Sequence, residues 1–119
     1  MKRTKLRKRS LNTLPKLKAK AEKLFHAWIC KRDRGVCFTC GKQGNQAGHF
    51  LHGKLDFEPL NLHCQCAGCN HYKSGNLGMY AIRLIDNYGQ VIVDDLIYRS
   101  NQVHKYTRDE LEKIIEKYK

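Results

Sequence analysis

Two cysteine pairs are the residues of this 119-residue sequence whose spacing most directly indicates chemistry. Cys37 and Cys40 form one Cys-x-x-Cys pair, and Cys66 and Cys69 form a second pair after 25 intervening residues. Two thiolates on one tight turn and two on another can surround a Zn²⁺ ion tetrahedrally. Because four cysteine ligands leave no coordination position open, we expect this zinc to stabilise the fold and to take no part in a reaction.

Two further cysteines fall outside this pattern. Cys64 could replace Cys66 as a ligand only with an irregular spacing to Cys69, so we expect it to pack beside the site. Cys30 lies in a predicted helix, where we expect a buried apolar side chain. No secretory signal is visible, so we expect the protein in the cytoplasm, where reduced Cys-x-x-Cys pairs bind metal more often than they form disulfides.

A histidine and two asparagines accompany the cysteine pairs in a fixed order. Gly48-His49 and Asn61 lie between the pairs, and Asn70 directly follows the second pair. This order resembles the HNH or His-Me finger nucleases. The segments KLFHAWICKRDRGVCFTCGK, QAGHF, NLHCQCAGCNHYKSGN and KYTRDELEKIIEKYK are similar to the phage NinG/Rap family of recombination endonucleases, over roughly residues 16–119. The resemblance implies an α+β fold with a small zinc-stapled ββα core, like a treble clef, and flanking helices at both ends.

The resemblance also implies roles for the three polar residues. A neutral imidazole can accept a proton near pH 7, so His49 is expected to activate water for attack on a phosphodiester. The hard amide oxygen of Asn70 suits Mg²⁺ or Mn²⁺, which can stabilise both the attacked phosphate and the leaving 3′ oxygen. Asn61 is implied to hold the loop that carries the base. The alternatives are a surface role for His49 and an ordinary helix position for Asn70.

Two residues depart from the family pattern, Gln46 and the surplus Cys64. Many relatives carry an acid two or three residues before the base histidine, whereas this chain has the neutral Gln46. The departure at Gln46 weakens the expectation of a metal ligand from the hairpin, but not the expectation for His49.

The resemblance implies a metal-dependent DNA endonuclease that acts on branched recombination DNA, such as a Holliday junction or a D-loop. Hydrolysis would leave a 5′-phosphate and a 3′-hydroxyl. Two symmetric cuts need two active sites, so we expect a homodimer, and a partner recombinase is an open question. The main alternative is a noncatalytic zinc-ribbon module that binds nucleic acid, and such a module would not need His49, Asn61 and Asn70.

The charge of the chain indicates an anionic partner. Lys and Arg number 23 against 11 Asp and Glu, the formal net charge is +12, and nine of the cations lie in residues 1–20, which contain no acid. We predict a disordered basic arm over residues 1–12 that binds DNA phosphates. RNA or an anionic membrane surface would satisfy the same charge, although no apolar run could cross a membrane. The predicted DNA contacts are Lys2, Arg3, Lys5, Arg7, Lys8, Arg9, His71 and Lys73.

We predict a single domain over residues 13–119. It is expected to consist of three segments, which together position the candidate site residues. Apolar residues at helical spacing predict an N-terminal helix over 13–34, capped by Thr13. The zinc and ββα core is expected over 36–76, with a hairpin formed by VCFTC and QAGHF and a short helix from about Ala67 to Ser74.

C-terminal helices are expected over 77–119. We predict that Met79, Ile82, Ile85 and Leu84 face the core. The segment QVIVDDLIYRS suits a helix better than a buried strand, and the sequence from Thr107 to Glu110 is a capping box. Tyr72 and Tyr80 are expected in the core rather than stacked on bases.

Overall fold

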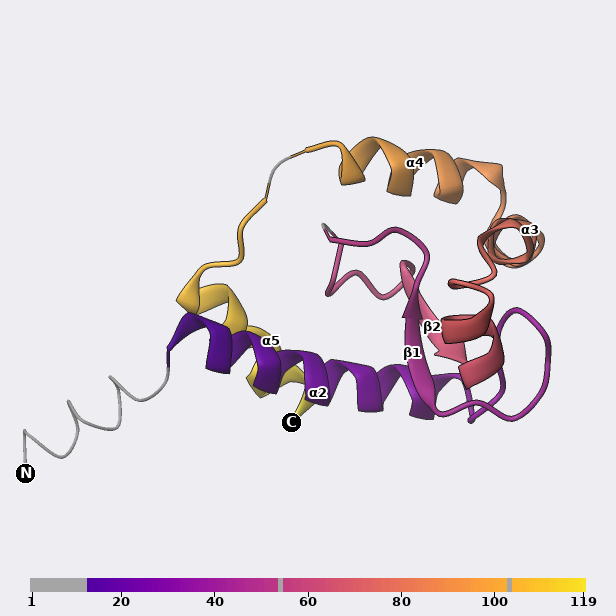
Figure 1. Cartoon of the computed structure of the whole chain (residues 1–119). Coiled ribbons are helices and arrows are strands. Elements are labelled where there is room, and N and C mark those ends of the chain that lie inside the picture. The colour runs from indigo at the N-terminus through magenta and orange to yellow at the C-terminus, as the bar shows by residue number, and fades with distance from the viewer. Residues whose placement is uncertain (1–12, 54, 103) are drawn as a thin grey trace, which may run out of the picture. The chain divides into compact units, whose positions relative to one another are not determined.

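The computed structural model describes residues 13–53, 55–102 and 104–119, and the predicted basic arm of residues 1–12 lies outside them. These residues form helices and one two-stranded sheet, so the expected α+β class is confirmed, whereas the His-Me finger assignment stays a prediction (Figure 1). The elements are α2 (Leu14–Arg32), β1 (Gln46–His49), β2 (Leu62–Gln65), η1 (Gly68–Tyr72), α3 (Leu77–Tyr88), α4 (Gln90–Ser100) and α5 (Arg108–Tyr118).

The described residues fall into two units, which are considered separately below. One unit contains residues 13–25 and 105–119, and the other contains residues 26–53, 55–102 and 104. The single domain expected over residues 13–119 therefore stays a prediction.

The first unit contains the N-terminal part of α2 and all of α5. Phe25 is fully buried, and its ring centroid lies 4.9 Å from that of Tyr118. The predicted capping box is confirmed, because the Glu110 amide donates to Thr107 Oγ1 and the Thr107 amide donates to the Glu110 carboxylate. The other buried apolar residues of this unit are Leu17, Ala21, Leu111 and Ile115.

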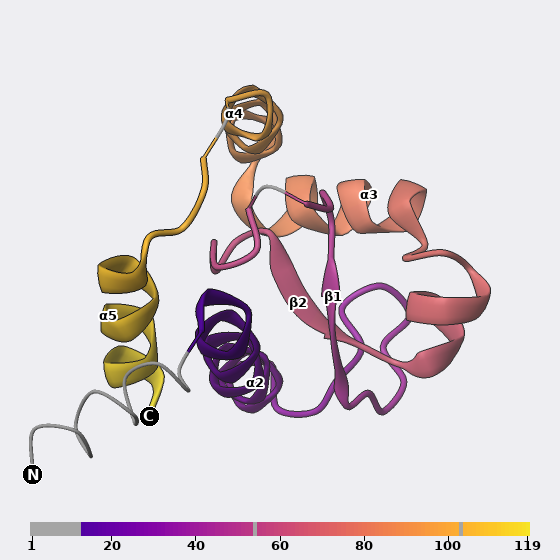
Figure 2. The same ribbon diagram turned by 60° about the vertical axis from the view of Figure 1, so that its left-hand side comes forward.

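The second unit is built around a hairpin whose first strand differs from the prediction. β1 pairs with β2 in antiparallel register, from Gln46 opposite Gln65 to His49 opposite Leu62 (Figure 2). The prediction of a strand at VCFTC was wrong, because residues 38–40 form a turn and Val36 makes only an isolated bridge with Gln43. A tight turn brings two cysteines three residues apart to one side of the backbone, which an extended strand would not do.

The short helix predicted from about Ala67 is a π-helix, η1, which contains Cys69. Its wide turn is closed by a hydrogen bond from the Lys73 amide to the Gly68 carbonyl, at 3.0 Å. The backbone then turns sharply through Ser74, Gly75 and Asn76, which have φ angles of 49°, 92° and 50°. Because Gly75 has no Cβ, it adopts this left-handed backbone at little cost.

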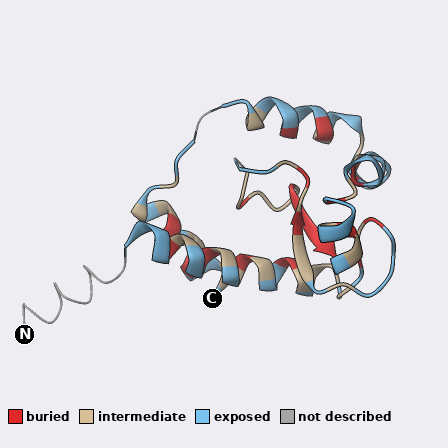
Figure 3. Cartoon of the chain, in the orientation of Figure 1, coloured by how far each residue is buried: buried red, intermediate tan, exposed pale blue. Residues whose placement is uncertain are grey.

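Helices α3 and α4 pack against each other, and their buried side chains Tyr80, Leu84, Val93 and Leu96 form a core with Phe50, which directly follows β1 (Figure 3). The assignment of QVIVDDLIYRS to a helix is confirmed.

The prediction that Met79, Ile82 and Ile85 face this core was wrong, since these side chains are 37%, 51% and 36% exposed. The same prediction for Leu84 is confirmed, because its side chain is fully buried. α3 carries two apolar stripes, and periodicity alone does not choose between them. Tyr80 selects the observed stripe, because its hydroxyl donates to the Gly48 carbonyl at 2.7 Å. None of the helices within the described residues is long and apolar enough to cross a membrane.

Candidate metal centre and histidine site

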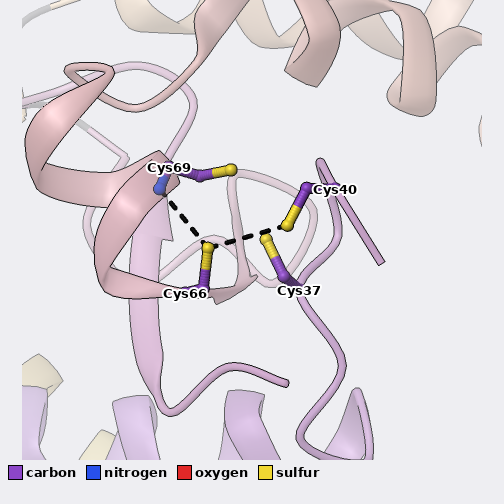
Figure 4. A group of neighbouring side chains, drawn as sticks. All are labelled: Cys37, Cys40, Cys66 and Cys69. Atoms are coloured by element: carbon purple, nitrogen blue, oxygen red, sulfur yellow. Dashed lines mark hydrogen bonds between the residues drawn. The ribbon is translucent and has the colours of Figure 1, made fainter. Parts of the chain in front are cut away.

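The four predicted zinc ligands converge in the structure. The Sγ atoms of Cys37, Cys40, Cys66 and Cys69 all lie within 4.8 Å of one another, and the side chains face a common point (Figure 4). The Sγ atoms of Cys40 and Cys66 are 3.6 Å apart. A tetrahedral site with Zn–S bonds of about 2.3 Å requires sulfur atoms roughly 3.8 Å apart. The cluster therefore fits a zinc ion. Cys37 and Cys40 come from the turn at residues 37–40, Cys66 directly follows β2, and Cys69 lies in η1.

Hydrogen bonds around the cluster favour charged sulfur. Thr39 Oγ1 lies 3.3 Å from Cys37 Sγ, and the Cys69 amide donates to Cys66 Sγ at 3.4 Å. Burial opposes the Cys37 thiolate, but the hydrogen bonds from Thr39 and from backbone amides outweigh it and lower the pKa of Cys37 to about 6. Asn76 Nδ2 donates to Cys69 Sγ at 3.6 Å in the same way. Such bonds orient metal ligands and stabilise their negative charge.

The crowding of the sulfurs shows why a cation is needed. The backbone of Lys42 favours the Cys40 thiolate, but partial burial and the neighbouring thiols raise the pKa of Cys40 to about 12. Four thiolates in so small a space repel one another. A bound Zn²⁺ would supply the positive charge that allows all four to ionise.

The two other cysteines lie outside the cluster. Cys64 is fully buried, and burial together with the adjacent Cys30 thiol raises the pKa of Cys64 to about 12. As the spacing predicted, it lies outside the group of four converging cysteines. Cys30 is half-buried rather than buried.

His49 ends β1 in a partly closed environment. Its side chain is 19% exposed, and its Nε2 lies 3.4 Å from the carboxylate Oδ1 of Asp56, which is 14% exposed. The His49 ring stacks on His52 with centroids 5.2 Å apart and meets His26 edge-on at 6.0 Å. Burial lowers the pKa of His49 from 6.5; the charge of Asp56 opposes this shift, and the two histidines add to it. The ring is therefore neutral at pH 7 and able to accept a proton.

Asp56 is the residue of this site that sequence analysis missed. It lies in the loop between the strands, seven positions after His49, and no spacing rule connects the two. The composition of the sequence did offer one indication that Asp56 has a specific role, since Asp56 and Glu58 are the only acids in residues 34–85.

Asn61 holds that loop. Its side chain is fully buried, its Oδ1 accepts from the Leu51 amide at 2.9 Å, and its Nδ2 donates to the carbonyls of Leu51 at 2.8 Å and Leu55 at 3.0 Å. The structure thus contains the hydrogen bonds to the loop backbone that the resemblance implied. Their importance for a reaction stays a prediction.

Asn70 reaches the hairpin at the position next to His49. Its Nδ2 donates to Gln46 Oε1 at 2.9 Å, and its Oδ1 lies 3.1 Å from the point where a Cβ on Gly48 would be. Gln46, a departure from the family pattern, therefore holds the amide nitrogen, and the amide oxygen faces Gly48. Since neighbouring side chains of a strand point to opposite faces, His49 and Asn70 lie on either side of the β1 backbone.

Gly48 is required at this point because two amides approach it. A Cβ there would collide with the side chain of Gln65 and press on Asn70 Oδ1. Gln65 is fully buried, and its Nε2 donates to Thr39 Oγ1 at 3.1 Å and to the Gly75 carbonyl at 2.9 Å. The glycine before the histidine thus allows both side chains to pack against β1.

The predicted DNA contacts are only partly within the described residues. His71 and Lys73 are exposed beside Asn70, whereas Lys2, Arg3, Lys5, Arg7, Lys8 and Arg9 lie outside the described part of the chain. Tyr80 is buried as expected, but the expectation of a buried Tyr72 was wrong, because this side chain is 88% exposed.

His63 lies in β2 and has a structural role. It is 1% exposed, stacks on Phe38 with centroids 3.9 Å apart, and makes hydrogen bonds to the hydroxyls of Tyr80 at 3.3 Å and Tyr88 at 3.2 Å. Burial, reinforced by the charge of Arg32, lowers the pKa of His63 to about 4. It is neutral at pH 7 and satisfied by its neighbours.

Comparison with known proteins identifies relatives of the chain. A family model described as "Bacteriophage Lambda NinG protein" matches residues 1–119. The protein ninG of Escherichia phage 933W is 35% identical over 122 residues, covering 96% of this chain and 60% of that protein. The ninG proteins of Escherichia phage lambda and Salmonella phage P22 are each 34% identical, with 96% of this chain and 59% and 60% of those proteins covered. The chain thus spans about 60% of the length of these curated relatives. No solved structure matches it.

Proposed function

The chain belongs to the phage NinG family, as its motifs predicted, and from this premise we propose that it is a metal-dependent DNA endonuclease of the HNH or His-Me finger type. The observation that carries the proposal is the arrangement along β1. His49 contacts Asp56 at the end of the strand, and the amide oxygen of Asn70 lies beside the preceding residue, Gly48. A noncatalytic zinc module would need neither arrangement.

In the proposed reaction His49 is the general base. Asp56 accepts a hydrogen bond from Nε2–H and so leaves Nδ1 as the proton acceptor for an attacking water. Burial keeps the ring neutral at pH 7, which a base requires. Asp56 holds the ring in one tautomer and one orientation, and it stabilises the imidazolium that forms.

Asn70 is the proposed ligand of Mg²⁺ or Mn²⁺. These ions prefer oxygen ligands and keep several waters, so one amide oxygen together with phosphate oxygens is a suitable set. Among the described residues, the four cysteines are the only cluster of three or more His, Cys, Asp or Glu ligands, so the hard metal would depend on the substrate for further ligands. When bound, the ion supplies charge neutralisation at the phosphate. The phosphate held at Asn70 must then lie within reach of the water that His49 activates.

The substrate and assembly follow from the family resemblance rather than from the geometry. We propose branched recombination DNA as substrate, cut to a 5′-phosphate and a 3′-hydroxyl, by a homodimer in the host cytoplasm. A net charge of +12 favours phosphate contacts, which position a protein on DNA without reading its sequence. Dependence on a recombinase is a further proposal of the same origin.

Cleavage of a synthetic four-way junction tests the proposal. Wild type and His49→Ala are incubated with and without Mg²⁺, and His52→Ala serves as the matched control because its exposed ring lies next to that of His49. We expect Mg²⁺-dependent cutting by wild type and by His52→Ala, and a loss of about 100-fold or more in His49→Ala, with zinc content and DNA affinity retained. If His49→Ala cuts as fast as wild type, His49 is not the base. If wild type binds the junction but cuts no DNA, the noncatalytic alternative is correct.

A further inference from the structure

Tyr72 is the most exposed large side chain with apolar character in the described part of the chain. It is 88% exposed, compared with 76% for Val91 and 67% for Tyr98. The three residues around it, His71, Lys73 and Ser74, are also exposed, so the outer side of η1 is open to solvent (Figure 3). An aromatic ring with a polar end, presented in this way, is typical of binding surfaces.

The backbone beneath Tyr72 is held firmly. Cys69 is buried within the four-cysteine cluster, and the Gly75 amide donates to the Cys69 carbonyl at 2.9 Å. The hydrogen bond from the Lys73 amide to Gly68 closes the wide turn of η1 around position 72. The ring is therefore carried on a braced segment, which limits the entropy lost when it binds.

The surroundings of Tyr72 in the sequence are poor in negative charge. Residues 34–85 contain two acids, and both are engaged elsewhere: Asp56 contacts His49, and Glu58 forms an ion pair with Arg99 at 3.0 Å. The side chain of Lys73 directly follows the tyrosine. A ring next to a cation, with no free acid in this segment, suits a partner that offers a flat π-face beside a negative charge.

We propose that Tyr72 stacks on an unpaired base of DNA while Lys73 contacts a neighbouring phosphate. An unpaired or unstacked nucleotide combines the π-face and the negative charge, whereas a paired base in a duplex has both faces covered. Tyr72 lies two residues after Asn70, and side chains at this spacing point to different faces of a helical turn, so the stacked nucleotide is a different one from that whose phosphate Asn70 would bind. This contact gives a preference for DNA with exposed bases, as at a branch. The inference rests on the DNA partner of the proposed function but not on cleavage.

Binding measured in the absence of Mg²⁺ tests this inference without cleavage. His49→Ala is the parent protein, and its affinities for a single strand, a four-way junction and a fully paired duplex are measured by fluorescence anisotropy. The variants Tyr72→Ala and Tyr72→Phe are added to this parent, and Tyr98→Ala is the control for loss of an equally large, exposed ring on α4.

We expect Tyr72→Ala to weaken binding to the single strand roughly 5- to 100-fold, the range found for loss of one base–aromatic stack. Binding to the junction should weaken in the same direction, and duplex affinity should change less than about twofold because no base face is free there. Tyr72→Phe and Tyr98→Ala should bind like the parent. A strand containing 2-aminopurine should be quenched by the parent and by Tyr72→Phe but not by Tyr72→Ala.

Several outcomes would overturn the inference. If Tyr72→Ala binds the single strand and the junction like the parent, Tyr72 does not stack, and the proposed nuclease function is unaffected. If duplex binding falls as far as single-strand binding, the residue contacts the backbone or supports the fold instead. If the parent binds none of these DNAs, the DNA partner itself is wrong, and both proposals fail.

Discussion

The two ends of the β1–β2 hairpin are organised by different kinds of bond. At one end, Gln46 pairs with Gln65 directly before Cys66, and four sulfurs converge on a site that fits zinc. At the other end, His49 pairs with Leu62, and Asn61 and Asp56 hold the loop and the imidazole by hydrogen bonds and charge. The first end depends on a few strong ligand bonds, whereas the second depends on several weak ones. Stability and reactivity can therefore be separated by substitution.

Loss of a zinc ligand should have the largest effect. Structural zinc contributes on the order of 10 kcal/mol to the free energy of folding, and a small domain without it does not have enough stability to compensate for the loss. We expect Cys37→Ser to lose bound zinc and the native near-ultraviolet circular dichroism of the core, while Cys30→Ser keeps both. Zinc analysis and thermal unfolding provide the measurement. One zinc per chain and native unfolding in Cys37→Ser would show that the cluster is not the structural centre.

Removal of the Asn61 side chain should have the next largest effect. Asn61→Ala leaves the Leu51 amide and two carbonyls without their partners, which should cost about 3 to 5 kcal/mol. We expect faster hydrogen exchange at the Leu51 amide and reduced cleavage, with zinc retained. Unchanged exchange at this amide would contradict the role assigned to Asn61.

Acid should destabilise the second unit through His63. Its folded pKa of about 4 lies below the ordinary value of 6.5, so the unfolded chain binds the proton more tightly. The stability that His63 contributes is complete above pH 6.5 and is lost as the pH falls towards 4, by about 3 kcal/mol. The variant His63→Phe should show a smaller decrease over this range than wild type. If the free energy of unfolding falls equally with pH in the two proteins, protonation of His63 does not destabilise the fold.

Replacement of Asp56 should have the smallest effect on stability, but it should change the pKa and the orientation of His49. Asp56→Asn removes the charge that raises the pKa of His49, so that pKa should fall further below 6.5. NMR titration of the His49 ring measures this shift, and cleavage should decrease about tenfold or more because the ring loses its orientation. Glu58→Gln, which removes the other acid of this loop, is the control. An unchanged His49 titration in Asp56→Asn would show that the 3.4 Å contact has no electrostatic effect.

The same contrast explains how much could be predicted from the sequence. A Cys-x-x-Cys pair encodes its own geometry within four residues, so the four cysteines that converge were identified correctly, and Cys64 lies outside them. The neighbours of His49 come from α2 and from the loop between the strands, and no local rule links His26, His52 and Asp56 to it. Asn61 and Asn70 were located by family resemblance, because asparagine occurs in too many contexts to indicate a site by itself.

The errors in the fold have related causes. VCFTC has the composition of a strand, but the turn that presents Cys37 and Cys40 overrides that propensity. In α3 both apolar stripes had the correct period, and only the hydrogen bond of Tyr80 to Gly48 distinguishes the inner one. Tyr72 was expected inside because aromatic residues usually are, and its exposure became visible only with the geometry of η1.

Chemical rescue of His49→Gly is the measurement that tests the central claim most directly. If the histidine end supplies the base while the cysteine end supplies only structure, this variant should contain one zinc per chain and cut a four-way junction very slowly. Added imidazole should then restore Mg²⁺-dependent cutting, with a rate that rises as the neutral form of imidazole increases. Full cutting by His49→Gly without imidazole, or loss of zinc together with activity, would contradict the account.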